Sequence, residues 1–165
     1  MTALMALVLT VSDGVTAGTR IDESGRQLAE RLTGEGFEVE RGTVPDERGA
    51  IAAAVRDGAA RHRLVVTTGG TGLTPRDVTP QTLEPMLDYQ VPGMAELMRA
   101  VGARTTPYAA LSRSLAGVMG RTLVLALPGS PKGALESLDA VLPVLAHALE
   151  TLADDSSRHT APVQR

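Results

Sequence analysis

A glycine-rich run that ends in an acid is the part of this sequence best suited to chemistry. Residues 67–77 read TTGGTGLTPRD and follow the apolar segment 64–66. Because glycine adopts positive φ angles at little cost, such a turn can aim several backbone N–H groups at one anion. The Lys-Ser/Thr pair of a Walker A loop and the G-x-G-x-x-G spacing of a Rossmann loop are both absent. We predict that Gly69, Gly70, Thr71 and Gly72 bind phosphate; the alternative is a tight turn without a ligand.

Two aspartates accompany this run. Asp77 closes it, and Asp46 follows the second predicted strand in a Pro-Asp pair. In open α/β sheets the loops after the strands meet at one edge, where paired carboxylates and substrate phosphates can share Mg²⁺. This predicts metal-assisted phosphoryl or nucleotidyl transfer, with Asp46 and Asp77 as metal ligands and catalytic residues. Two alternatives remain: Asp46 caps a helix, and Asp77 pairs with Arg76 or braces the loop.

Other polar residues follow predicted strands and are further candidates for binding a phosphate ester. Lys132 is the only lysine in the chain, which marks either a functional ammonium or an arginine-biased composition. Ser112 and Arg113 offer a hydroxyl and a guanidinium that suit a phosphate ester. The alternative is that they form a helix end with a solvated arginine. The full set of these candidates is Ser12, Asp13, Ser112, Arg113, Pro128, Gly129, Ser130 and Lys132.

Alternating strand and helix patterns must position these residues. Strands are predicted at 4–11, 37–44, 64–68, 115–119 and 122–127, and helices at 22–35 and 47–60. Further helices are predicted to start at Thr79 as N-cap, at Pro92 and at Pro131, and Pro143 is expected to kink or divide the last one. Ile21 is assigned to the apolar face of the first helix, with Leu28, Ala29 and Leu32. This alternation favours right-handed crossovers on a parallel sheet.

Composition narrows the class of protein. The chain has 165 residues, 43% hydrophobic, which fits one domain over residues 1–153, and the polar residues 154–165 are expected to form a flexible tail. Because cysteine is absent and the three histidines are scattered, zinc-thiolate sites are excluded and a transition-metal site is disfavoured. A net charge of -3 with 2% aromatic residues disfavours nucleic acid as a partner. With no basic leader and no apolar run of roughly 18 residues, we expect a cytoplasmic protein and no membrane contact.

The motifs occur together in an order that resembles one family. Ser12-Asp13, Pro45-Asp46, the glycine run, the segments 76–80 and 111–113, and the Leu-Pro-Gly at 127–129 are similar to those of molybdopterin adenylyltransferases of the bacterial MogA/MoaB type. The resemblance spans about residues 5 to 150 of the chain. It implies a three-layer αβα sandwich with a mostly parallel central sheet.

The resemblance also implies an activity: Mg-ATP-dependent adenylylation of the terminal phosphate of molybdopterin, with release of pyrophosphate. Asp46 and Asp77 would take the places of the essential aspartates and hold Mg²⁺, and residues 69–72 would cradle the nucleotide phosphates. Ser112 matches the serine at the family's molybdopterin site. The other candidates named above would be weaker contacts there, and they are assigned from their position in the predicted sheet.

Assembly and rival functions follow from the same resemblance. The family forms trimers, sometimes dimers of trimers, and the apolar residues 94–101 could supply either core or interface. Hand-over of product to a molybdate-insertion protein is implied as well. The rivals are a MoaB-like paralogue that binds molybdopterin or a protein without catalysis, the molybdate-inserting branch, and a nucleotide-cleaving enzyme, the last two usually being parts of longer chains.

Overall fold

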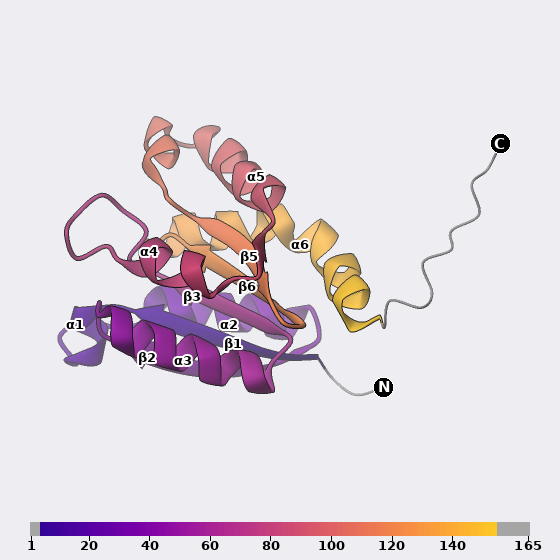
Figure 1. The fold of residues 1–165 in the computed structure, drawn as a ribbon. Helices are drawn as coiled ribbons and strands as arrows, with labels where there is room; N and C mark the ends of the chain where they lie inside the picture. The colour runs from indigo at the N-terminus through magenta and orange to yellow at the C-terminus, as the bar shows by residue number, and fades with distance from the viewer. Residues whose placement is uncertain (1–3, 155–165) are drawn as a thin grey trace.

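The computed structural model describes residues 4–154 and contains one six-stranded sheet (Figure 1). The strands are β1 (Leu4–Val11), β2 (Phe37–Val44), β3 (Leu64–Thr68), β4 (Tyr89–Gln90), β5 (Leu115–Met119) and β6 (Thr122–Leu127). Their order across the sheet is β2-β1-β3-β6-β5-β4. The first four strands in this order run parallel, while β5 pairs antiparallel with both β6 and β4. The prediction of a mostly parallel sheet is therefore confirmed.

Helices cover both faces of the sheet. The longer ones are α2 (Glu23–Gly34), α3 (Arg48–Arg61), α5 (Pro92–Ala103) and α6 (Pro131–Ala153), and the short elements are α1 (Asp13–Thr16), α4 (Thr79–Leu83), η1 (Glu84–Met86) and η2 (Pro107–Leu111). Apolar residues of α2, α5 and α6 pack on one face of the sheet, and those of α3 and α4 pack on the other. This arrangement is the three-layer αβα sandwich implied by the resemblance.

Strand β1 shows why both faces are covered. Successive side chains of a strand point to opposite faces, and both sets are apolar here. Ala6 and Val8 belong to the cluster under α2 and α6, whereas Leu7 and Leu9 belong to the cluster under α3. A sheet that is buried on both faces leaves only its strand ends to carry polar chemistry.

Helix α2 forms close to its predicted bounds. Asp22 is the N-cap and its Oδ1 accepts a hydrogen bond from the Gly25 N–H at 3.0 Å. Gly36, with φ +90°, ends the helix by donating its N–H to the carbonyl oxygen of Thr33. The assignment of Ile21 to the apolar face is wrong, because Ile21 precedes the cap and is 84% exposed.

Two proline-related expectations differ from the structure. Val78, not Thr79, is the N-cap of α4, and Thr79 is the first helical residue; its hydroxyl donates to the carbonyl oxygen of Gly69. Pro143 does not divide α6, which runs unbroken from Pro131 to Ala153. The expectation that Pro92 opens a helix is confirmed.

The other expectations concern residues 94–101 and the C-terminal segment. Met94 and Met98 are buried in the protein's own core, whereas Leu97 is exposed. Apart from Asp154, the predicted tail lies outside the described residues. Between residues 4 and 154, no helix is long and apolar enough to cross a membrane.

Candidate phosphate-binding site

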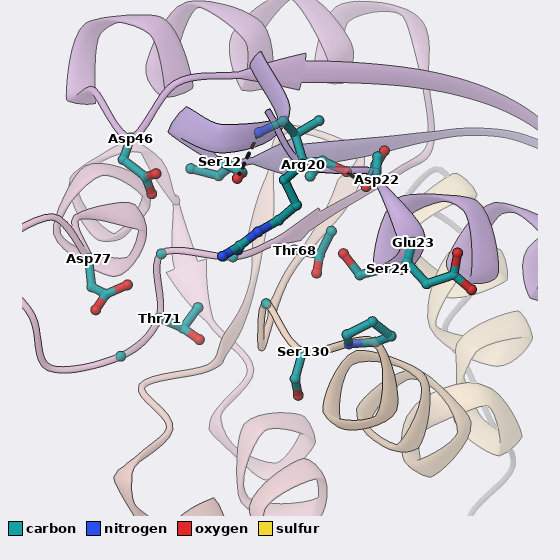
Figure 2. A pocket seen from close by; sticks show the side chains of 18 of the residues that line it. Ser12, Arg20, Asp22, Glu23, Ser24, Asp46, Thr68, Thr71, Asp77 and Ser130 are labelled. Atoms are coloured by element: carbon teal, nitrogen blue, oxygen red, sulfur yellow. Dashed lines mark hydrogen bonds between the residues drawn. The ribbon is translucent and has the colours of Figure 1, made fainter. Parts of the chain in front are cut away.

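A cavity of about 610 Å³ lies where β1 and β3 end (Figure 2). From β1 the chain crosses to β2 at the sheet edge, and from β2 it returns to β3 on the other side of β1. Open α/β sheets bind ligands at such a switch in strand order. The residues that line the cavity are Thr10, Val11, Ser12, Val15, Arg20, Ile21, Asp22, Glu23, Ser24, Asp46, Thr68, Gly69, Gly70, Thr71, Gly72, Asp77, Gly129, Ser130 and Pro131.

The glycine loop, residues 69–72, is fixed by its surroundings. Gly69 and Gly70 have φ angles of +106° and +68°. A methyl group on Gly69 would lie 2.2 Å from the carbonyl oxygen of Val11, and one on Gly70 would lie 2.3 Å from Thr79 Oγ1. The carbonyl oxygens of both glycines accept hydrogen bonds from Thr79, at 2.9 and 3.1 Å. Only glycine fits these positions, so the loop has one defined backbone path.

That backbone path leaves donors available to a ligand. The N–H of Gly69 donates to the carbonyl oxygen of Leu127 at 3.1 Å. By contrast, the N–H groups of Gly70, Thr71 and Gly72 make no hydrogen bond within residues 4–154, although all of these residues line the cavity. Consecutive free N–H groups in a glycine turn form an anion-binding concavity. The geometry supports the predicted phosphate loop.

Asp46 lines the same cavity as this loop and is held by Asp13. Its Oδ2 accepts from the Asp13 N–H at 2.9 Å, and its own N–H donates to Asp13 Oδ1 at 3.0 Å. Asp13 Oδ2 in turn accepts from Arg76 at 2.7 Å, and this partner lowers the pKa of the Asp13 carboxyl. Burial raises the pKa of Asp46, to which the nearby carboxylates of Asp13 and Asp77 add. The capping alternative for Asp46 is wrong, because the N-cap of α3 is Glu47.

Asp77 follows the loop in sequence and lines the same cavity. Its Oδ2 accepts hydrogen bonds from the backbone N–H and the hydroxyl of Thr74, at 2.9 and 2.7 Å. Arg76, the alternative partner, pairs with Asp13 instead. Arg113 fixes the segment from outside by donating to the carbonyl oxygens of Gly72 and Asp77 at 2.6 and 2.8 Å. Asp77 therefore braces the loop and also points into the cavity (Figure 2).

The two aspartates form a donor set that suits a hard divalent cation. Each carboxylate uses its Oδ2 for protein hydrogen bonds, and Oδ1 of each makes none in the part of the chain that the structure describes. Among residues 4–154, no cluster of three or more acidic or histidine side chains could hold a metal. Mg²⁺ in proteins is typically coordinated by one or two carboxylates, and substrate phosphates and water complete its coordination shell. The residues present fit such an ion.

The remaining predicted site residues fall into three groups. Ser12, Gly129 and Ser130 line the main cavity. Ser112 and Pro128 line a second cavity of about 190 Å³, which shares Ser130 with the first. The other three line neither cavity: Asp13 holds Asp46, Arg113 binds loop carbonyls, and Lys132 is 73% exposed with its Nζ 4.0 Å from Glu136. The structure therefore gathers most, but not all, of the predicted residues.

Sequence reasoning missed one wall of the cavity. Asp22, Glu23 and Ser24, at the start of α2, line it together with Thr10 and Thr68. Residues 22–25 read Asp-Glu-Ser-Gly. The local pattern indicates only the start of a helix here. A capping acid, followed within three residues by serine and glycine and preceded by the loop after a strand, is nevertheless a signal that the sequence contains.

Taken together, the fold and the cavity define an α/β protein with a cavity at the switch point of its sheet, lined by free N–H groups that suit a phosphate group. The chain belongs to the family described as "Probable molybdopterin binding domain", whose model matches residues 7–147. This agrees with the resemblance drawn from the motifs.

Individual relatives support this membership. The chain is 54% identical to the molybdopterin biosynthesis enzyme MoaB of Thermus thermophilus, whose crystal structure superposes with a TM-score of 0.85 and covers 90% of this chain and 96% of that one. It is 36% identical to the molybdopterin adenylyltransferase of Helicobacter pylori over 88% of this chain and 85% of that protein. It is also 38% identical to gephyrin of Dictyostelium discoideum over 86% of this chain, but spans only 21% of gephyrin.

Proposed function

We propose that this protein transfers an adenylyl group from ATP to the terminal phosphate of molybdopterin, a step of molybdenum cofactor biosynthesis. In this reaction a phosphate oxygen of molybdopterin forms a bond to the α-phosphorus of ATP, the bond from that phosphorus to the bridging oxygen breaks, and pyrophosphate leaves. The observation that carries the proposal is the glycine loop with free N–H groups, which lines one cavity together with two carboxylates. The relation to proteins named molybdopterin adenylyltransferase supports it.

The residues of the main cavity would act through charge and position. The free N–H groups of residues 70–72 would donate to oxygens of the attacked phosphate, where negative charge develops. Asp46 and Asp77 would hold Mg²⁺ through their free Oδ1 atoms, and a bound Mg²⁺ neutralises charge on the triphosphate. Asp13 would keep Asp46 in place. No covalent nucleophile is required by this scheme.

The second cavity offers a place for the pterin. Ser112 and Ser114 line it with their hydroxyl oxygens 2.8 Å apart. Because Ser130 lines both cavities, a ligand in the second cavity can extend its phosphate toward the glycine loop. We therefore assign molybdopterin to the second cavity and the nucleotide to the first.

Assembly and location belong to the same proposal. We expect a homotrimer or a dimer of trimers, hand-over of the adenylylated product to a molybdate-insertion protein, and action in the cytoplasm as one domain. The exposed Leu97 on α5 is available for an interface, whereas Met94 and Met98 are used by the core. Sedimentation of the purified protein measures the assembly.

The test is direct. The purified protein is mixed with molybdopterin, ATP and Mg²⁺, and mass spectrometry detects adenylylated molybdopterin while a coupled assay measures pyrophosphate. Formation of both products supports the proposal, and a chelator should abolish it. Molybdopterin binding without the adduct would instead indicate a MoaB-like binding paralogue, and ATP turnover without molybdopterin would indicate a nucleotide-cleaving enzyme.

A further inference from the structure

Ser24 presents an unused hydroxyl to the main cavity. It is the second residue of α2 and is only 7% exposed. Neither its hydroxyl nor its backbone N–H makes a hydrogen bond within the described chain. Figure 2 shows the side chain pointing into the cavity. A hydroxyl and a first-turn N–H that are both free, on one residue at a cavity wall, are two donors that a ligand in the cavity can use.

The start of α2 holds Ser24 rigidly. Asp22 accepts from the N–H of Gly25 at 3.0 Å and from the hydroxyl of Thr10, on β1, at 2.9 Å. Gly25 lies so close to both that a methyl group there would be 2.3 Å from Asp22 Oδ2 and 2.4 Å from Thr10 Oγ1. The helix is thereby attached to the sheet at its first turn. A donor held in this way loses little freedom when it binds.

The charges around Ser24 favour an anion. Helices α2 and α6 both begin at the cavity, and a helix N-terminus carries partial positive charge. Of the two nearby acids, Asp22 pairs with Arg41 at 2.8 Å, and Glu23 pairs with Arg26, which also pairs with Glu30. Arg20 lines the same cavity and has no carboxylate partner between residues 4 and 154. Figure 2 shows its side chain reaching between Ser12 and Thr71.

We propose that Ser24 and the N-terminus of α2 bind a phosphate group, at a subsite separate from the glycine loop and the two aspartates. This assignment rests on the proposed function for its choice of ligand. Adenylyl transfer requires the cavity to hold the attacked phosphate together with further anionic groups, namely the departing pyrophosphate and the phosphate of the pterin. The Ser24 N–H and hydroxyl would donate to oxygens of one of these groups.

Two substitutions separate binding from folding. Ser24→Ala removes the hydroxyl and keeps a good helix former. Ser24→Asp places a negative charge in the first turn of α2, where the helix dipole favours it, so the thermal midpoint of this variant should be maintained. The same charge repels a bound phosphate, so phosphate binding should be lost. Thr33→Ala is the control, because it removes an exposed hydroxyl at the far end of the same helix.

Calorimetric titration then measures the affinity for inorganic pyrophosphate, Mg-ATP and molybdopterin. We expect roughly tenfold weaker binding in Ser24→Ala, the size of a lost hydrogen bond to a charged group, and a larger loss in Ser24→Asp. Weakening confined to pyrophosphate and ATP assigns the subsite to the triphosphate, and weakening confined to molybdopterin assigns it to the pterin phosphate. Unchanged affinity for all three probes in both variants overturns the proposal, as does an equal loss in Thr33→Ala.

The same proteins separate this inference from the proposed activity. If the natural protein forms no adenylylated molybdopterin but Ser24→Asp still loses pyrophosphate binding, the subsite stands and the proposed function fails. If the natural protein forms the adduct and both Ser24 variants bind every probe normally, only the subsite fails.

Discussion

Asp13 and Asp46 bind each other reciprocally, each donating its backbone N–H to the carboxylate of the other, at 2.9 and 3.0 Å. The pair joins the loop after β1 to the loop after β2, 33 residues apart in sequence. Arg76, from the segment after β3, then binds Asp13 at 2.7 Å. The loops that follow three parallel strands thus meet at the carboxylate of Asp13. Because Asp46 Oδ2 is used in this contact, Oδ1 is the carboxylate oxygen that Asp46 has free at the cavity.

This relationship predicts that Asp13 acts through Asp46. Asp13→Ala removes the acceptor of the Asp46 N–H and should lower the rate of adenylyl transfer roughly tenfold, the loss expected from one hydrogen bond. Asp13→Asn keeps an oxygen for that N–H and should lose less. The measurements are kcat and the Mg²⁺ concentration for half-maximal activity. A merely structural role would change the thermal midpoint and leave the Mg²⁺ dependence unaltered.

Asp77→Asn tests the second carboxylate. The amide oxygen can still accept from Thr74, so the loop should persist and the thermal midpoint should change little. The negative charge is lost, so Mg²⁺-dependent transfer should fall by a factor of about 100 or more, as expected for a group that organises charge in the transition state. Mass spectrometry of the product measures this. Full activity in the variant would remove Asp77 from the mechanism.

The glycine loop allows a matched pair of substitutions. Gly69 and Gly120 both have positive φ, +106° and +61°, but only Gly69 lacks space, since a methyl group there would meet the backbone of Val11 at 2.2 Å. Gly120→Ala should lower the free energy of unfolding by about 1 kcal/mol, the cost of a left-handed alanine. Gly69→Ala should cost more than that and abolish phosphate binding. Urea denaturation measures both, and equal losses would contradict the proposed crowding.

Much of the fold could be predicted from sequence because its signals are local. The buried strand 64–68 is apolar up to its two threonines. Gly36 indicates where a helix stops because it adopts a positive φ, and Pro92 indicates where a helix starts because proline fits its first turn. The site is less predictable from sequence, because contacts between segments that are distant in the chain determine what each of its side chains binds. Arg113 binds Gly72, 41 residues away, and Arg76 binds Asp13, 63 residues away. No pattern along the chain indicates such pairings.

Ser24 and Pro143 show two ways in which interpretation of local sequence can mislead: it can overlook a residue at a cavity, and it can predict a break in a helix that continues. The Ser24 hydroxyl sits beside a capping acid, and a helix-start motif explains those residues without any ligand. Pro143 is expected by local rules to kink or divide its helix; division is wrong, because α6 continues through it and packs residues on both sides of it, Val141 and Leu145, into the core. Burial of those residues outweighs the hydrogen bond that proline cannot donate.

Arg113 is the residue for which sequence and structure lead to different experiments. The sequence predicts that its guanidinium binds molybdopterin, whereas the structure shows it donating to the carbonyl oxygens of Gly72 and Asp77. Arg113→Lys keeps the charge but cannot reproduce a planar fork that reaches both carbonyls. If Arg113 braces the loop, the variant should lose about 1 to 2 kcal/mol of stability and most of its ATP affinity while binding molybdopterin normally.

The control for Arg113→Lys is Arg31→Lys, which alters an exposed arginine paired with Glu35 and Asp139. Exposed ion pairs contribute little, so this variant should match the natural protein in stability and in affinity for both ligands. A loss of molybdopterin affinity in Arg113→Lys with ATP binding intact would instead support direct recognition of the pterin. The two ligand titrations therefore decide whether Arg113 acts through the loop or on the substrate.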